Sequence, residues 1–247
     1  ILDAHVALPG YADLPLAAYF TLAGLALWRW LEDRGWDDAF LVVLFACACA
    51  TIKNPGRAWV LVLLPAVIAG VVPRFGVRIA FASLGAGILL LLALARTNLT
   101  LFGYQLHLDF VPPWQGLADA YLFYANWHLL WYGAIAVALL GWRQWLSKQN
   151  APLTVLLASS LLFLLFGFAF TNAGAWVEDQ STVNRATLPV APLLVVWMLV
   201  VFEAWAARLA PPPARRERRE REWAVPEFKR LEEARAALGT GAAAEAT

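Results

Sequence analysis

The sequence has few charged residues and almost no cysteine. Only 15% of its 247 residues are charged and the formal net charge is +1, whereas about 25% of the residues of an average soluble domain are charged. This composition excludes an ordinary soluble enzyme and a disordered chain, and the small net charge excludes nucleic acid as the main partner. The two cysteines, Cys47 and Cys49, are two positions apart in an apolar run. On a helix they point to different faces, so we expect packing residues and no disulfide or metal cluster.

Long apolar runs predict an integral membrane protein with about seven spans. Hydrophobic residues make up 61% of the chain, and a spanning helix needs about 20 of them in succession. The runs 39–52 and 58–73 are shorter and are separated by the segment 53–57, whose proline and glycine break a helix. Fused, they would extend about 50 Å, beyond a hydrocarbon core of about 30 Å. The fusion gives a six-span alternative, but we expect two helices that meet in a turn, in an all-α transmembrane bundle with spans at 14–31, 39–52, 58–73, 79–95, 121–142, 152–170 and 189–206.

Positive charge predicts which connections face the cytoplasm. The connections after the first, third and fifth spans and the C-terminal tail carry most of the basic residues: Arg29, Arg34, Arg74, Arg78, Arg143, Lys148, Arg208, Arg215, Arg216, Arg218, Arg219 and Arg221. The arginine-rich side of a membrane protein is cytoplasmic. We therefore expect Asp13, the turn at Lys53, the loop 96–120 and the loop 171–188 to face outward from a plasma (inner) membrane.

The chain divides into a membrane part and a tail. Residues 1–206 are the predicted transmembrane domain, and residues 207–247 are predicted to be a charged cytoplasmic tail, first helical and then disordered. The first residue is Ile1 and the opening residues have no signal-peptide pattern, so we expect the later part of a longer protein. The excess of arginine over lysine, with abundant alanine and tryptophan, suggests a GC-rich bacterial source.

Three ionisable residues on the outer side are the main candidates for a site, because charge near hydrocarbon is costly. Asp13 lies at the mouth of the first span, where it is either a helix N-cap or a carboxylate directed into an outer cavity. Lys53 is one of three lysines and either snorkels to the interface or binds a lipid phosphate. Arg185 precedes the last span and either pairs with Glu178 or Asp179 or holds a phosphate through its planar guanidinium.

Aromatic and polar residues alternate in the loop 97–120 and just after it. Such a pattern is typical of sugar-binding surfaces, but it is equally typical of an interfacial aromatic belt, which we favour. No spacing of histidine, cysteine or acidic residues predicts a metal site. The residues concerned are Tyr104, His107, Asp109, Trp114, Asp119, Tyr124, Asn126, Trp127 and His128.

Three motifs resemble a known family. They are Gly10-Tyr11-Ala12-Asp13-Leu14-Pro15-Leu16, Ala50-Thr51-Ile52-Lys53-Asn54-Pro55-Gly56, and Ser181-Thr182-Val183-Asn184-Arg185 through Pro192. In this order, and all on the outer side, they resemble the later part of the GT-C-fold glycosyltransferases that use polyprenyl-phosphate sugars. The protein mannosyltransferase and lipid A aminoarabinose transferase group is the most similar. The resemblance covers roughly residues 5–205.

The resemblance implies transfer of a sugar from a polyprenyl-phosphate donor to an acceptor on the outer membrane face. It gives Lys53 and Arg185 the role of binding the donor phosphate and gives Asp13 a catalytic carboxylate role in positioning substrate. It implies weaker, substrate-lining roles for Tyr11, Asn54, Arg57, His107, Asp109, Asn126, His128, Glu178, Asp179 and Asn184. The family's principal acidic pair belongs to an earlier outer loop, and Asp3 is not in a matching context, so that pair is expected upstream or is absent.

The expected partners are thus the lipid bilayer, a polyprenyl-phosphate sugar donor and an acceptor that the sequence does not identify. No cofactor is identified, and a divalent metal is left open. Two other functions fit the same charges. A carrier or flippase-like protein would bind a lipid phosphate without chemistry, and a structural subunit of an envelope complex would use the charges only as caps and salt bridges.

Overall fold

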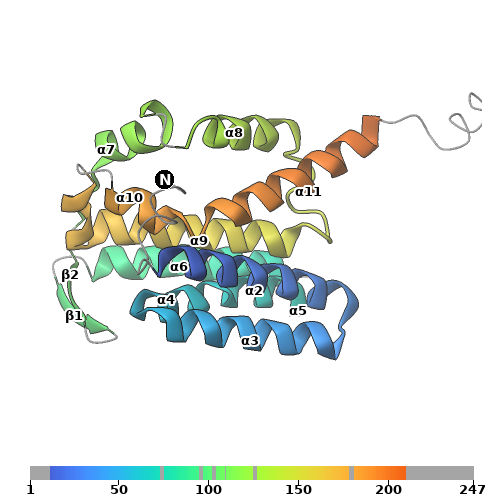
Figure 1. Ribbon diagram of the computed structural model, residues 1–247, viewed down its shortest axis with the longest axis horizontal. Helices are drawn as coiled ribbons and strands as arrows, with labels where there is room; N and C mark the ends of the chain where they lie inside the picture. Colours follow the sequence, from blue (N-terminus) through green and yellow to red (C-terminus); the bar gives the residue numbers. More distant parts are fainter. Residues whose placement is uncertain are drawn as a thin grey trace, which may run out of the picture. The chain divides into compact units, whose positions relative to one another are not determined.

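The structure is a computed structural model and is predominantly helical. It describes residues 12–72, 75–94, 97–101, 104–108, 110–124, 127–177 and 181–209. Residues 1–204 form one compact unit and residues 205–247 a second, and the first unit holds nearly all the described residues (Figure 1). The predicted tail, apart from the end of the last helix, lies outside the described residues.

The described helices follow one another with short connections. The α-helices are α2 (Asp13–Asp33), α3 (Trp36–Ile52), α4 (Asn54–Val62), α5 (Leu64–Val71), α6 (Gly76–Ala93), α7 (Trp114–Ala118), α8 (Leu130–Leu140), α9 (Ala151–Phe170), α10 (Ser181–Thr187) and α11 (Ala191–Leu209). A π-helical turn, Asp119–Phe123, continues α7, and a 3-10 helix, Asn172–Trp176, follows α9.

Local sequence explains where these helices break. Helix α2 ends at Arg34, whose left-handed backbone (φ 57°) returns its N–H to the carbonyl of Trp30. Helix α3 ends at Lys53 because that residue is extended (φ −157°), and Pro55 then lies in the first turn of α4, where its missing N–H costs nothing. The predicted break between two short helices at segment 53–57 is confirmed.

A second break separates α4 from α5 at Leu63, where Pro65 follows in the first turn of α5. The N–H of Ala66 bonds to the carbonyl of Leu63, and the carbonyl of Val62 instead accepts a bond from the Ser159 hydroxyl at 2.9 Å. A buried carbonyl needs such a partner. The break therefore fixes α9 against the α4–α5 pair.

Four helices of the described part are long and apolar enough to cross a membrane: α2, the α4–α5 pair, α9 and α11. Shorter apolar helical stretches lie at Gly76–Leu90 and Leu130–Leu140. The structure therefore shows a helical protein with membrane-spanning candidates, and fewer of them than the seven predicted spans. The expected span 121–142 in particular is not one helix, because a turn containing His128 with positive φ (49°) precedes α8. The 11 residues of α8 rise only about 16 Å.

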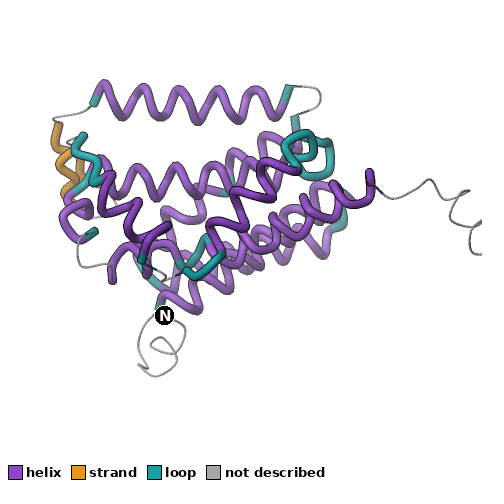
Figure 2. The backbone as a smooth tube through the Cα atoms, turned by 90° about the horizontal axis from the view of Figure 1, so that it is seen from above, coloured by secondary structure: helices purple, strands orange, loops and turns teal. Residues whose placement is uncertain are grey.

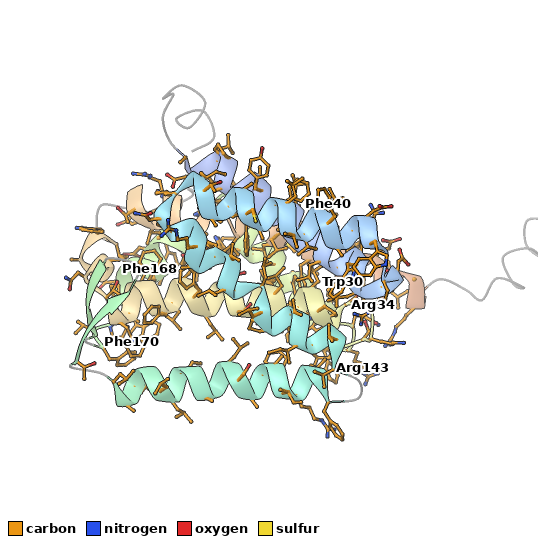
Figure 3. All side chains as sticks on the ribbon, turned by 90° about the horizontal axis from the view of Figure 1, so that it is seen from below. Trp30, Arg34, Phe40, Arg143, Phe168 and Phe170 are labelled. Carbon is orange, nitrogen blue, oxygen red and sulfur yellow. The ribbon has the colours of Figure 1, made fainter. Side chains whose placement is uncertain are left out.

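Contacts group the connections at two ends of the unit. At one end, which we call the acidic-triad end, Lys53 and Arg185 both bond to Asp13. At the other, which we call the arginine-rich end, Trp28 donates to the carbonyl of Gln149 and Arg34 donates to the carbonyl of Gly70. In Figure 3 the labelled Arg34 and Arg143 lie at the end opposite to Phe168 and Phe170. The predicted grouping of the connections into two sets is confirmed for these segments.

A β-hairpin is the main departure from the expected all-α fold. Strands β1 (Thr97–Leu101) and β2 (Tyr104–Leu108) pair antiparallel in the register Thr97↔Leu108 to Leu101↔Tyr104. The hairpin lies at the end of the unit that also holds α7 and α10 (Figures 1 and 2). It projects from the segment that the sequence predicted to be an irregular interfacial loop.

The core is apolar and contains an aromatic stack. Phe20 of α2 contacts Trp59 of α4 with ring centroids 4.9 Å apart, and Trp59 contacts Phe163 of α9 edge-on at 4.9 Å. Phe20 is fully buried and Trp59 is nearly so. Such pairs add about 0.5–1.5 kcal/mol beyond their buried area, so α2, α4 and α9 form the rigid part of the unit beneath the acidic-triad end.

Candidate anion site

Asp13, Lys53 and Arg185 form an ion-pair triad. The Lys53 ammonium lies 2.6 Å from Asp13 Oδ1, and the Arg185 Nε lies 2.8 Å from Asp13 Oδ2. The Asp13 side chain is 5% exposed, whereas those of Lys53 and Arg185 are 35% and 40% exposed. One carboxylate thus holds two cations that are far apart in the sequence, and the triad keeps one excess positive charge.

The interpretation of Asp13 as an N-cap is wrong. Ala12 occupies the N-cap position of α2, Asp13 is the first residue of the helix, and no side chain caps it. Both carboxylate oxygens instead accept bonds from cations. Lys53 likewise does not merely snorkel, because its ammonium is bound within the protein.

The triad opens into a cavity of about 500 Å³ whose remaining walls are mostly apolar. Its lining includes the three triad residues together with Leu16, Asn54, Pro55, Ala58, Trp59, Phe163, Leu164, Phe166, Gly167, Phe168, Thr171, Ala173, Trp176, Thr182, Ala186 and Pro189. Asp13 is the one acidic residue among these described lining residues. A positive rim on an apolar hollow suits a ligand with an anionic head and a hydrocarbon body.

The turn between α3 and α4 fixes Lys53. The N–H of Gly56 bonds back to the carbonyl of Lys53 at 2.8 Å, and Gly56 packs directly on the end of α3. A Cβ at position 56 would lie 1.8 Å from the carbonyl oxygen of Cys49, so only glycine permits this approach. The ammonium of Lys53 is therefore positioned by backbone packing rather than by a flexible loop.

Two hydrogen bonds from the segment around the π-helical turn hold α10, which carries Arg185. The Tyr121 hydroxyl and the Thr187 hydroxyl are 2.7 Å apart, and Trp127 Nε1 donates to Asn184 Oδ1 at 2.8 Å. Asn184 and Thr187 are buried. Because α10 is a short helix, these bonds rather than its own length determine where the Arg185 guanidinium lies.

We predict that Trp127→Phe lowers stability by about 1–3 kcal/mol, the cost of leaving a buried polar group without its partner. The indole ring is replaced by another aromatic ring, so the lost donor to the buried Asn184 is the main change. Thermal unfolding of the purified protein in detergent measures the effect. Trp36→Phe is the matched control, because Trp36 is 89% exposed; an equal shift in both variants would contradict this role for Trp127.

The weaker candidates have separate positions. Asn54 lines the cavity, whereas Arg57 and His128 are exposed and are not among the lining residues. Asn184 does not line this cavity either, since its side chain is buried against Trp127. His107 lies in β2 opposite Asn98, and Tyr11, Asp109, Asn126, Glu178 and Asp179 lie outside the described residues. The alternative pairing of Arg185 with the last two is thus not described, while its bond to Asp13 is.

Several residues of the site were not predicted from the sequence. Trp59, Phe163 and Phe166 form apolar walls, and Trp176 and Thr182 lie near the mouth with the cations. The sequence predicted Trp127 only as a member of the aromatic belt and did not single out Tyr121. Within the described residues, no group of three or more metal-ligating side chains is close enough to hold a metal ion.

Comparisons with protein-family models, curated proteins and solved structures give no match. A functional proposal for this chain therefore rests on the site. Its geometry provides an ammonium, a guanidinium and a carboxylate at the rim of an apolar cavity. This set can bind a phosphate through charge-assisted hydrogen bonds and can bury an attached hydrocarbon chain.

Proposed function

We propose that the protein is a membrane glycosyltransferase that takes a sugar from a polyprenyl-phosphate donor. The observation that supports this most is the pairing of Lys53 and Arg185 with one carboxylate at the rim of an apolar cavity. Two cations are costly at the end of membrane-spanning helices unless something anionic compensates them. Asp13 compensates only one of the two charges. A lipid phosphate would compensate the other.

The cavity suits the two parts of such a donor. The phosphate would bind at the Lys53 ammonium and the Arg185 guanidinium, since both keep N–H groups beyond the one bonded to Asp13. The isoprenoid chain would lie against apolar side chains such as Phe163 and Phe166. Each methylene removed from water contributes about 0.8 kcal/mol, so the chain would supply affinity and the cations would supply selectivity for the phosphate.

The proposed reaction is a displacement at the anomeric carbon. The oxygen of an acceptor hydroxyl forms a bond to that carbon, the bond from the carbon to the phosphate oxygen breaks, and polyprenyl phosphate leaves with the electron pair. Lys53 and Arg185 stabilise the charge that develops on the leaving phosphate, an effect often worth several kcal/mol in a site with little water. Asp13 positions the two cations, and its remaining lone pairs are available to the acceptor hydroxyl or its proton.

In this proposal the acidic-triad end faces outward and the arginine-rich end faces the cytoplasm, as the distribution of positive charge favours. We predict that an impermeant thiol reagent labels Asn54→Cys in intact cells and labels Lys148→Cys only after permeabilisation. Both positions are exposed, so a difference reports sidedness. Cys47 and Cys49 are replaced by alanine in this background. Labelling of Lys148→Cys alone would reverse the assignment.

A second candidate function is that of a carrier that binds a lipid phosphate without chemistry. It is favoured by one observation: both oxygens of Asp13, the one carboxylate among the described lining residues, are already bonded to cations. A carrier needs the cations and the apolar cavity but no group to take a proton. It predicts binding of the lipid with no loss of its sugar.

The test is transfer from a set of polyprenyl-phosphate hexoses and pentoses labelled in the sugar. The full-length protein in proteoliposomes is mixed with source membranes as acceptor. We expect label to leave the lipid with release of polyprenyl phosphate, and we expect Asp13→Asn to lower the rate by about 10²–10⁴-fold at equal membrane insertion. Donor that binds to the wild-type protein but keeps its sugar would reject the transferase and favour the carrier.

A further inference from the structure

A second cavity lies at the arginine-rich end and is not part of the triad site. It has a volume of about 720 Å³ and lies between the end of α2, the end of α5, the start of α6 and the connection that leads into α9. Its charged lining residues are Arg34, Lys148 and Glu32, and its apolar ones include Leu31 and Leu146. The described lining therefore carries two cations and one acid.

Glu32 and Arg34 are already held by neighbouring residues. Glu32 Oε1 accepts a bond from Gln149 Nε2 at 3.1 Å. The Arg34 guanidinium donates to the carbonyl of Gly70 at 2.8 Å and lies 5.1 Å from the ring centre of Trp30. One N–H of five is used in that bond, so the guanidinium is oriented at the cavity wall with further donors available.

Lys148 supplies the second positive charge. Within the described residues its ammonium makes no hydrogen bond or ion pair that the structure records, and the residue is exposed. Exposed aromatic residues are found at the same end: Trp36 begins α3 and is 89% exposed, and Trp142 is 61% exposed with Arg143 over its ring. Tryptophan concentrates at the depth of lipid headgroups, so this cavity opens where headgroups lie.

We propose that this cavity binds the phosphate of an anionic phospholipid of the bilayer. Arg34 and Lys148 would hold the headgroup phosphate, and Leu31 and Leu146 would contact the beginning of the acyl chains. Basic pockets between helices on the cytoplasmic side bind anionic headgroups in this way. The site is independent of the triad and of the proposed transfer, and it would fix the ends of α2, α5 and α9 to the lipid leaflet at this end.

The experiment measures lipid binding to the purified full-length protein by native mass spectrometry. Phosphatidylglycerol is titrated in detergent against the wild type, Lys148→Ala and Arg143→Ala. Arg143 is the matched control, because it is an exposed cation of the same connection that does not line the cavity. A basic residue near a headgroup contributes on the order of a fivefold change in affinity. We expect about that loss for Lys148→Ala and no change for Arg143→Ala.

Two further arms identify the ligand. Phosphatidylcholine should bind more weakly than phosphatidylglycerol, and inorganic phosphate at equal concentration should not displace the lipid. Equal binding of the two lipids, displacement by inorganic phosphate, or an equal loss in Arg143→Ala would each overturn the proposal. The Asp13→Asn variant should bind phosphatidylglycerol as the wild type does, so the failure of one proposal is distinguishable from the failure of the other.

Discussion

Replacement of Arg185 by alanine is expected to weaken binding of polyprenyl phosphate by about 10- to 150-fold. This range corresponds to the loss of about 1.5–3 kcal/mol, the usual contribution of a hydrogen bond to a charged group. The triad has one excess positive charge, and Arg185→Ala removes it, because Asp13 and Lys53 then neutralise each other. Equilibrium binding of a fluorescent polyprenyl phosphate to the protein in detergent measures the change.

Arg57→Ala is the matched control for charge. Arg57 is a cation of the same connection region as Lys53, but it is exposed and does not line the cavity. Its removal should leave binding within about twofold, since an exposed charge contributes little. Arg185→Lys should bind between the wild type and Arg185→Ala, because the charge remains but the planar guanidinium is lost. If Arg57→Ala and Arg185→Ala weakened binding equally, long-range attraction rather than the triad would bind the lipid.

Gly56→Ala is expected to destabilise the protein by more than the about 1–3 kcal/mol that overpacking usually costs. The new Cβ would lie 1.8 Å from the carbonyl oxygen of Cys49, a backbone atom that cannot move aside alone. The turn would have to open, which separates α3 from α4 and displaces Lys53. We expect a marked fall in the midpoint of thermal unfolding, with loss of polyprenyl-phosphate binding in whatever protein remains folded.

Gly85 and Gly87 in α6 provide the comparison. A Cβ at either position meets nothing within 4 Å, and alanine is a better helix former than glycine by up to about 1 kcal/mol. Gly85→Ala and Gly87→Ala should therefore be neutral or slightly stabilising. A Gly56→Ala protein as stable as these two would show that the α3–α4 turn is not packed as the structure has it.

The sequence predicts the triad well because charge is informative in a membrane protein. Lys53 and Arg185 are separated by 131 intervening residues, yet each is exceptional for the same reason, a cation on the side that carries few. That anomaly identifies the two residues, and Asp13 is found beside them by its position at the start of a span. The sequence does not show that one carboxylate bonds to both cations, because this depends on how α10 packs.

The apolar wall of the cavity was not predictable in the same way. The helices that contain Trp59 and Phe163 are apolar on all sides, so periodicity does not separate residues that face lipid from residues that face the interior. The hydrogen bonds of Tyr121 and Trp127 to α10 also leave no local pattern. Both features arise from packing between segments that are distant in the sequence.

The β-hairpin and the short α8 were predictable only in part. Leu99 and Leu101, and then Leu106 and Leu108, alternate with polar residues as strands do, and glycine separates the two runs at position 103. That alternation is a usable signal, and the prediction of an interfacial loop gave it no weight. The turn before α8 has no comparable signal, since a positive φ at a histidine is a consequence of tertiary structure.

The most direct test of the anion site compares two lipids that differ only in their head. Polyprenyl phosphate and the polyprenol of the same length compete for the wild-type protein with a fluorescent polyprenyl phosphate, in a neutral detergent at low salt. We expect the phosphate form to bind at least about tenfold more tightly, since each charge-assisted bond contributes more than a neutral one. Equal affinity for the two lipids would contradict an anion site, because the cavity would then recognise hydrocarbon alone.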